Sequence, residues 1–313
     1  MSFAMIFPGQ GSQSVGMLDK HAASSKHIKA TMDEASKVLD YDTWGLAQQG
    51  PESKLNKTEY TQPLLLAASV AMWRAFCDST EARPTIMAGH SLGEYTALVC
   101  AGVLDFHDAL RLVRTRGKLM QTAVASGKGA MAAIIGLTDQ VVAEVCKTAA
   151  EGEVVEAVNF NAPGQVVIAG NVTAVDRAMK AAEGQGARMV TKLAVSAPSH
   201  CSLMKNAAKR LSHELEGVPL RDHEIPILHN IDARDRHGID DMRRALVSQL
   251  HSPVRWVDVM TGIADSGATL AIECGPGRVL TGLVKRNDKR VKGLAMDVDN
   301  GIRAAAAAAE ENE

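Results

Sequence analysis

Short apolar runs alternate along the chain with longer segments whose apolar positions recur every three to four residues. The short runs are typical of buried strands and the longer segments of amphipathic helices. Strands are predicted at 3–7, 85–88 ("TIMA"), 225–230 ("IPILHN") and 269–273 ("TLAIE"), and helices at about 17–39, 61–76 (with Thr61 as N-cap), 94–103, 105–125, 199–215, 241–250 and 257–264, followed by a last helix. This alternation indicates a mostly parallel sheet covered by helices.

The pattern changes between Gly127 and about Ser196. Four strand-like runs ("GAMAAIIGL", "EVVEAVNF", "GQVVIAG" and "RMVTKLAVS") enclose two helical segments ("TDQVVAEVCKTAA" and "VTAVDRAMKAAEGQG"). Strand, helix, strand, strand, helix, strand is the ferredoxin-like order. We therefore predict an α/β protein with a large domain of residues 1–126 and 197–313 and a small ferredoxin-like domain inserted at 127–196. The tail "RAAAAAAEENE" is low in complexity and is expected to be a frayed helix end.

Composition narrows the class of protein. The 313 residues are 46% hydrophobic and 22% charged, enough for a large core. A net charge of −2 excludes a general attraction to nucleic acid or to a membrane surface. The five cysteines are scattered without C-x-x-C spacing, so they indicate thiols of a reducing compartment and neither disulfides nor a zinc site. No run suits a signal peptide or a membrane span, and the predicted location is cytoplasmic.

The most distinctive motif is Gly89-His90-Ser91-Leu92-Gly93, placed between a predicted strand and a predicted helix. In this setting the glycines allow a tight turn that lifts the serine side chain, and the following helix offers N–H groups to a developing oxyanion. The motif indicates acyl chemistry at Ser91. It does not distinguish transfer from hydrolysis.

A nucleophilic serine needs a base, and the chain has ten histidines. His90 adjoins Ser91, but neighbours on such a turn usually point apart, which favours a packing role. His200 lies in "AVSAPSHCSLM", where an apolar strand ends and a helix is predicted to begin, so its ring would stay neutral near the helix N-terminus. From spacing alone, His200 is the best of several candidates.

Arg116 is a cation on the wrong face of its helix. In "DALRLVRTRGKLMQTAVA" the apolar residues occupy one arc, Arg111, Arg114 and Lys118 lie opposite, and Arg116 falls near the middle of the apolar arc. A buried guanidinium requires an anion. That anion is either an internal Asp or Glu or the carboxylate of a substrate, and the second choice suggests an acyl group that carries its own carboxylate.

Motifs along nearly the whole chain resemble one family. "FPGQGSQ", "GHSLGEY", "RTRGKLMQ", "GAMAAIIGL", "NFNAPGQVVIAG", "VSAPSHCSLM", "QLHSPVRW" and "IECGPGRVLTGLVKR" occur in the order found in the malonyl-CoA:acyl-carrier-protein transacylases of bacterial type II fatty acid synthesis. The resemblance implies an α/β-hydrolase-like large domain beside the ferredoxin-like one. It also implies ping-pong transfer of a malonyl group from coenzyme A to the phosphopantetheine thiol of acyl carrier protein, with no permanently bound cofactor and no metal.

The resemblance also implies roles for residues. Ser91 is similar to the family's nucleophile and His200 to its base. The backbone N–H groups of Gln10 and Leu92 match the oxyanion hole, and Arg116 matches the clamp on the malonyl carboxylate.

Other positions follow in the same way. Gln249 is similar to the residue whose backbone carbonyl orients the histidine. Asn159 and Asn161 fall in a matching motif and receive no role. Carrier proteins are acidic, so Lys285 and Arg286, with the nearby Lys289 and Arg290, are candidates for a docking patch, although a solvated charged face is the commoner explanation of such a run.

Three alternatives stay open from the sequence. An α/β-hydrolase-type esterase or thioesterase would use the same serine and histidine, but with a buried Asp or Glu between them. A non-catalytic carrier-binding module would be expected to have lost one of the site residues. The acyl preference could also be methylmalonyl, or the enzyme could serve polyketide synthesis.

Overall fold

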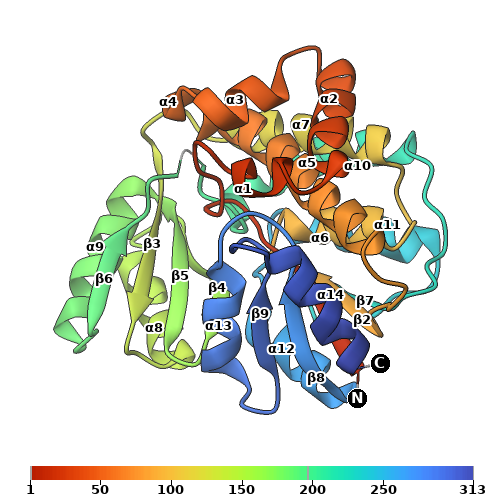
Figure 1. Ribbon diagram of the computed structural model, residues 1–313. Coiled ribbons are helices and arrows are strands. Elements are labelled where there is room, and N and C mark those ends of the chain that lie inside the picture. The colour runs from red at the N-terminus through yellow and green to blue at the C-terminus, as the bar shows by residue number, and fades with distance from the viewer. Residues whose placement is uncertain (1, 196, 313) are drawn as a thin grey trace.

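The structure, a computed structural model, describes residues 2–195 and 197–312. Its strands form two separate sheets, one parallel and one antiparallel, and helices pack on both (Figure 1). The predicted α/β class, with a mostly parallel main sheet and a small second sheet, is confirmed.

The main sheet has five parallel strands in the order β7-β2-β1-β8-β9. The strands are β1 (Ser2–Phe7), β2 (Ile86–Gly89), β7 (Ile227–Leu228), β8 (Ala268–Glu273) and β9 (Lys292–Ala295). Phe7 at the end of β1 pairs with Gly89 at the end of β2. The loops that follow these two strands therefore leave the same edge of the sheet side by side. They contain the motifs "FPGQGSQ" and "GHSLGEY".

Alternate residues of β1 enter different cores. Phe3, Met5 and Phe7 join the larger apolar cluster, and Ala4 and Ile6 join a smaller one on the opposite face. The smaller cluster is closed by α12 (Trp256–Asp265) and α13 (Val279–Asn287). The larger cluster contains residues of α2 (Lys26–Leu39), α3 (Thr43–Gln49), α4 (Glu52–Leu55), α5 (Thr58–Cys77), α6 (Gly93–Cys100), α7 (Phe106–Thr122), α10 (Lys205–Glu216), α11 (Ile239–Gln249) and α14 (Gly301–Glu311).

The second sheet is antiparallel, in the order β4-β5-β3-β6. It consists of β3 (Gly129–Ile135), β4 (Val155–Ala162), β5 (Gln165–Asn171) and β6 (Met189–Lys192), with α8 (Asp139–Ala149) and α9 (Val172–Gly184) packed on it. The chain order β3, α8, β4, β5, α9, β6 is the predicted ferredoxin-like one. This unit occupies one side of the molecule (left in Figure 1). The domain limits stay a prediction, and residues 1, 196 and 313 lie outside the described residues.

Several predicted helix limits are wrong for local reasons. The helix expected at 17–39 is divided into α1 (Asp19–Ala22) and α2, because Ser25 caps α2 by accepting from the His27 N–H. Thr61 is not an N-cap. Helix α5 begins at Thr58, and the Thr61 hydroxyl donates instead to the carbonyl of Leu55.

Three further predictions in the C-terminal half are wrong. The single last helix expected after residue 273 is two helices, α13 and α14, with strand β9 between them. The helix expected from residue 199 begins later, as a 3₁₀ turn η1 (Ser202–Met204) followed by α10. As far as residue 312 the tail is not frayed, because α14 buries Ile302, Ala305 and Ala309. None of the described helices has the length and apolar character needed to cross a lipid bilayer.

Candidate active site

Ser91 occupies a strained turn between β2 and α6. Its backbone φ is 52°, in the left-handed region that a serine rarely adopts. A Cβ on Gly89 would lie 1.9 Å from the backbone of Gly93, and a Cβ on Gly93 would lie 2.1 Å from the carbonyl oxygen of Phe7. The two glycines of the motif are therefore required by the close approach of strand and helix, which raises Ser91 above the sheet edge.

His200 meets Ser91 from a distant part of the chain. Its Nε2 lies 2.8 Å from the Ser91 Oγ, and its Nδ1 lies 2.8 Å from the carbonyl oxygen of Gln249. Because a carbonyl only accepts, the Nδ1 must carry the proton, and Nε2 presents its lone pair to the serine hydroxyl. The partner of Nδ1 is therefore a backbone carbonyl, where the esterase alternative requires a carboxylate.

The surroundings of His200 keep its ring neutral. Burial and the nearby Arg116 guanidinium lower the pKa of His200 from 6.5 to about 3, although the Gln249 carbonyl favours the charged form. The expected explanation, a helix N-terminus, is not the main cause, since His200 precedes η1 in a turn with φ 65°. A neutral imidazole is the form that can accept a proton.

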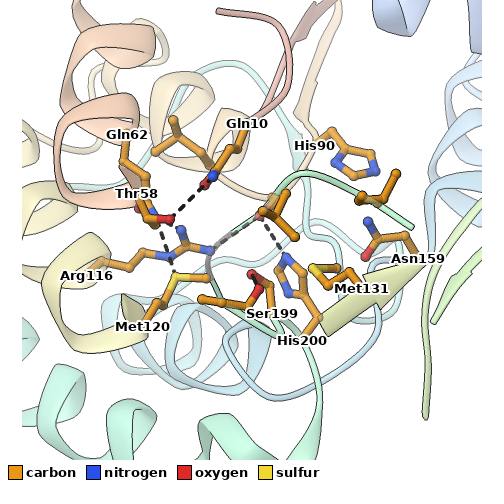
Figure 2. Close-up of a pocket in the computed structure, with 15 residues that line it drawn as sticks. Gln10, Thr58, Gln62, His90, Arg116, Met120, Met131, Asn159, Ser199 and His200 are labelled. Carbon is orange, nitrogen blue, oxygen red and sulfur yellow. Dashed lines mark hydrogen bonds between the residues drawn. The ribbon is translucent and has the colours of Figure 1, made fainter. Parts of the chain in front are cut away.

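Arg116 is buried on α7, as its place in the apolar arc predicts, with 1% of the residue exposed. Its guanidinium donates to Gln62 Oε1 (2.7 Å), to Gln249 Oε1 (3.0 Å) and to the Ser91 Oγ (3.4 Å). The face of the Tyr95 ring lies 5.2 Å from its central carbon. Figure 2 shows Arg116 and His200 reaching into one pocket from different elements.

The Arg116 guanidinium lacks a direct anion. Among the described residues no Asp or Glu oxygen lies within 4.0 Å of it, and its Nε is buried without a hydrogen-bond partner. The Glu94 carboxylate is linked to Arg116 through the Gln249 side-chain amide, which accepts from Arg116 and donates through Nε2 to Glu94 at 2.9 Å. An internal salt bridge, the first of the two explanations for this cation, is therefore absent from the described part of the chain, and the site can still take a carboxylate.

Gln10 and Leu92 line the same pocket as Ser91. Gln10 follows β1 and Leu92 precedes α6, and neither backbone N–H has a hydrogen-bond partner among residues 2–195 and 197–312. Free N–H groups beside a nucleophile are what an oxyanion hole requires. The assignment of this role to the two residues stays a prediction.

Beneath the turn lies a buried polar network that the sequence analysis missed. Asn230 accepts from the Ser91 N–H at 2.7 Å and donates to the Gly89 carbonyl at 2.7 Å. The Glu94 carboxylate, fully buried, accepts from the Asn230 N–H at 2.9 Å and pairs with His229 Nδ1 at 2.7 Å. His229 and Asn230 directly follow the short strand β7, so their place at the carboxyl edge of the sheet was a usable signal.

His90 points away from Ser91, as expected. Its Nε2 lies 2.8 Å from Asn161 Oδ1, and burial lowers its pKa. Asn159 lines the pocket, and its Oδ1 is buried with no partner in the described part of the chain. The asparagine motif thus supplies one residue that holds His90 and one polar group that is free to contact a ligand.

The pocket is narrow, with a volume of about 90 Å³. Side chains from the antiparallel unit, including Met131 and Asn159, close it on one side, and residues of α5 and α7 close it on the other (Figure 2). It thus lies where the two sheets' units meet.

The predicted docking residues are not among those that line this pocket. Lys285 and Arg286 are exposed at the end of α13, and Arg286 donates to Gln165 Oε1 at 2.6 Å. Arg290 is paired with Asp265 and Asp288, so its charge is largely compensated.

Known proteins with similar sequences and structures share one activity in their names. The acyl transferase domain family matches residues 4–305. The malonyl CoA-acyl carrier protein transacylase of Escherichia coli K12 is 52% identical over 303 residues, which cover 97% of this chain and 98% of that protein.

Two solved structures are also similar to this chain over nearly its whole length. An acyl carrier protein S-malonyltransferase from Vibrio cholerae has a TM-score of 0.94 and 50% identity, covering 97% of this chain and all of that one. A malonyl-transacylase solved in complex with a type II polyketide acyl-carrier protein has a TM-score of 0.96 and 50% identity, covering 100% of both chains.

Proposed function

The chain belongs to the acyl transferase family, and we propose that Ser91 and His200 carry a malonyl group from malonyl-CoA to acyl carrier protein, with Arg116 holding its carboxylate. The chain is thus an enzyme, an S-malonyltransferase of fatty acid synthesis. Malonyl-CoA and acyl carrier protein are the substrates of this family. The cytoplasmic location and the lack of any permanently bound cofactor stay predictions.

The observation that carries the residue assignment is the position of Arg116. Its guanidinium lies 3.4 Å from the Ser91 Oγ, is buried, and has no carboxylate in direct contact among the described residues. A malonyl group on Ser91 would place its free carboxylate within reach of this cation. Arg116 would then pair with an anion, which no described side chain supplies by direct contact.

The first half-reaction forms the malonyl ester. His200 Nε2 accepts the proton of Ser91 as the oxygen attacks the thioester carbonyl, and the resulting oxyanion accepts from the N–H groups of Gln10 and Leu92. When the tetrahedral intermediate collapses, the C–S bond breaks and His200 returns the proton to the leaving coenzyme A thiolate. The Gln249 carbonyl holds the ring in the tautomer that both steps need.

The second half-reaction repeats these steps with the carrier thiol as nucleophile. His200 takes the thiol proton, and the thiolate attacks the ester carbonyl. The bond between the acyl carbon and the Ser91 oxygen then breaks, and His200 returns the proton to that oxygen. Because coenzyme A and the carrier present the same phosphopantetheine thiol, one pocket serves both.

We infer that exposed Lys285 and Arg286 attract the acidic carrier, and that Arg188, which borders the same surface groove as Arg286, adds to this charge.

Mixing the enzyme with malonyl-CoA tests the transfer. The intact mass of the enzyme should rise by one malonyl group per chain. When holo carrier protein is added, the enzyme should lose this mass and the carrier should gain it. Release of free malonate at the same rate with and without carrier would identify a hydrolase instead.

A second carrier is favoured by one observation. The structural relative in complex with a type II polyketide carrier protein is as similar to this chain as the transacylase from Vibrio cholerae. We therefore propose that the malonyl-enzyme also discharges to polyketide carriers, which the same mass measurement detects when the two carriers compete.

The pH dependence follows from the lowered pKa of His200. Since the neutral ring is the base and its pKa in the free enzyme is about 3, kcat/KM for malonyl-CoA should stay flat from pH 8 to about pH 5. Protonation removes the base only as the pH falls further. An acid limb between pH 6 and 7 in the wild-type enzyme would contradict the assignment.

Arg116 provides the control for this profile. Arg116→Gln removes one of the causes that lower the pKa of His200, so the remaining activity should lose its base at a higher pH than the wild type. Arg111→Gln, on the exposed face of α7, should leave the profile unchanged.

A further inference from the structure

A cluster of histidines and aspartates lies outside the active site, around the segment that carries β7. Asp222 and His223 precede this strand, and Asp235 and His237 follow the turn after it. One ligand atom from each of Asp222, His223 and His237 lies within 4.8 Å of the others. The two histidine rings are 5.1 Å apart, so residues separated by a whole strand and turn meet at one point.

His223 has a free nitrogen inside the protein. Its Nε2 lies 3.0 Å from the Arg236 carbonyl oxygen and 3.0 Å from Asp235 Oδ1, both of which accept. Nε2 therefore carries the proton, and Nδ1 holds a lone pair. This Nδ1 is buried and has no hydrogen-bond partner in the described part of the chain, and the side chain is 1% exposed.

An imidazole that donates one nitrogen to a carboxylate or carbonyl and leaves the other bare is oriented as metal-bound histidines are. Without a ligand, the buried lone pair of Nδ1 has an unmet hydrogen-bonding requirement, which is destabilising. An ion coordinated there would remove that cost.

The charge of the cluster also suits a cation. Asp235 Oδ2 lies 3.3 Å from His237 Nε2, and Asp222 Oδ1 lies 3.8 Å from His237 Nδ1. Within residues 2–195 and 197–312, neither aspartate has an Arg or Lys at ion-pair distance. Of the arginines close by in sequence, Arg236 pairs with Asp232 and Asp241, and Arg243 pairs with Asp240. Arg221 and Arg234 are exposed and form no ion pair with Asp222 or Asp235 among the described residues.

We propose that Asp222, His223 and His237 form a binding site for a divalent first-row transition ion of the Zn²⁺ class. His223 coordinates through Nδ1, Asp235 orients that ring from the outside, and water completes the sphere. Two imidazoles and a carboxylate match the donor preference of Zn²⁺, Co²⁺ and Ni²⁺ over that of Mg²⁺ or Ca²⁺.

The ligand atoms must approach one another to close the site. Tetrahedral bonds of about 2.1 Å place ligand atoms roughly 3.4 Å apart, closer than the 4.8 Å limit within which they now lie. The two ligands that must move are the exposed ones, with side chains 69% (Asp222) and 75% (His237) accessible.

The bound ion would join the two ends of the segment that places His229 and Asn230 beside the Ser91 turn, because its ligands precede and follow that segment. Asn230 accepts from the Ser91 N–H, so this loop is part of the support of the nucleophile. The site is distinct from the transfer chemistry, and no proton or acyl group passes through it.

Titration of tag-free, chelator-treated protein with Co²⁺ and Zn²⁺ tests the proposal. We expect one ion per chain by calorimetry, visible Co²⁺ absorption bands, and a rise in the unfolding temperature with metal concentration. Mg²⁺ and Ca²⁺ should give none of these. His237→Gln, at an exposed position, should weaken binding at least about tenfold, the lower end of the loss caused by removing even an outer partner of a metal ligand.

The matched control is His213→Gln, which changes an exposed histidine of α10 that stands beside Glu216. It should bind Co²⁺ as the wild type does. Equal Co²⁺ affinity in the wild type and His237→Gln would overturn the proposal, as would the absence of saturable 1:1 binding. In the metal-free protein, nitrogen NMR should find the His223 proton on Nε2, and Zn²⁺ should shift the Nδ1 resonance. A Nδ1 resonance unmoved by saturating Zn²⁺ would equally reject it.

Discussion

Ser91→Ala is expected to abolish the malonyl adduct that malonyl-CoA forms on the enzyme. The Ser91 Oγ is the hydroxyl that faces the lone pair of His200 Nε2, at 2.8 Å, and alanine offers no atom to attack the thioester. Removing such a nucleophile costs on the order of 10⁶ in rate. Intact-mass spectrometry and a transfer assay with holo carrier protein measure the two consequences.

Ser199→Ala is the matched control, because Ser199 is the other serine that lines the pocket among the described residues. Its hydroxyl contacts the carbonyl of Ala197 at 3.5 Å and contacts neither Ser91 nor His200 in the described structure. The adduct should form in this variant. An adduct that survives Ser91→Ala and disappears in Ser199→Ala would show that Ser199, and not Ser91, is the nucleophile.

Arg116→Ala should remove malonyl transfer selectively. Losing one partner of a buried, hydrogen-bonded charge pair costs about 2–5 kcal/mol, which lowers kcat/KM for malonyl-CoA by a factor between about thirty and several thousand. Acetyl-CoA has no carboxylate to pair, so its transfer should fall much less or rise. The ratio of the two kcat/KM values is the measurement, because it cancels any general damage to the site.

Two further variants separate charge from shape. Arg116→Lys keeps a cation but loses the planar fork that donates to Gln62 and Gln249, so it should recover only part of the selectivity. Arg111→Ala, whose side chain pairs with Asp108 on the exposed face of α7, should retain the wild-type ratio. An unchanged ratio in Arg116→Ala would show that another group binds the carboxylate.

The fold class could be predicted because its signals are local. Apolar runs and helical periodicity depend on neighbouring residues, and they predicted both the parallel sheet and the order of the ferredoxin-like elements. Some errors fell at helix ends, where single side-chain contacts decide the limit, and the short elements α3, α4 and β9 were not predicted. The Ser25 hydroxyl caps α2, so one predicted helix is divided into α1 and α2. The Thr61 hydroxyl donates to the Leu55 carbonyl and does not cap a helix.

The candidate site divides in the same way. The Ser91 turn was predictable because both glycines and the flanking elements are adjacent in sequence. Arg116 was predictable as a buried cation because helical periodicity alone places it among Leu112, Val113 and Met120. The choice of His200 among the histidines rested on the family resemblance, since spacing left several candidates.

The amino-acid sequence by itself thus determined the strand-turn-helix that presents Ser91, the inward direction of Arg116 and the family. The tertiary structure alone decided which groups meet across long separations. It places the Gln249 side-chain amide between Arg116 and Glu94 and sets Asn230 beneath the Ser91 turn. It likewise joins His223 and His237 around one point. The physical reason is that a backbone pattern specifies which face a residue occupies, whereas a partner across the sheet edge is fixed only when the strands pair and the cores close.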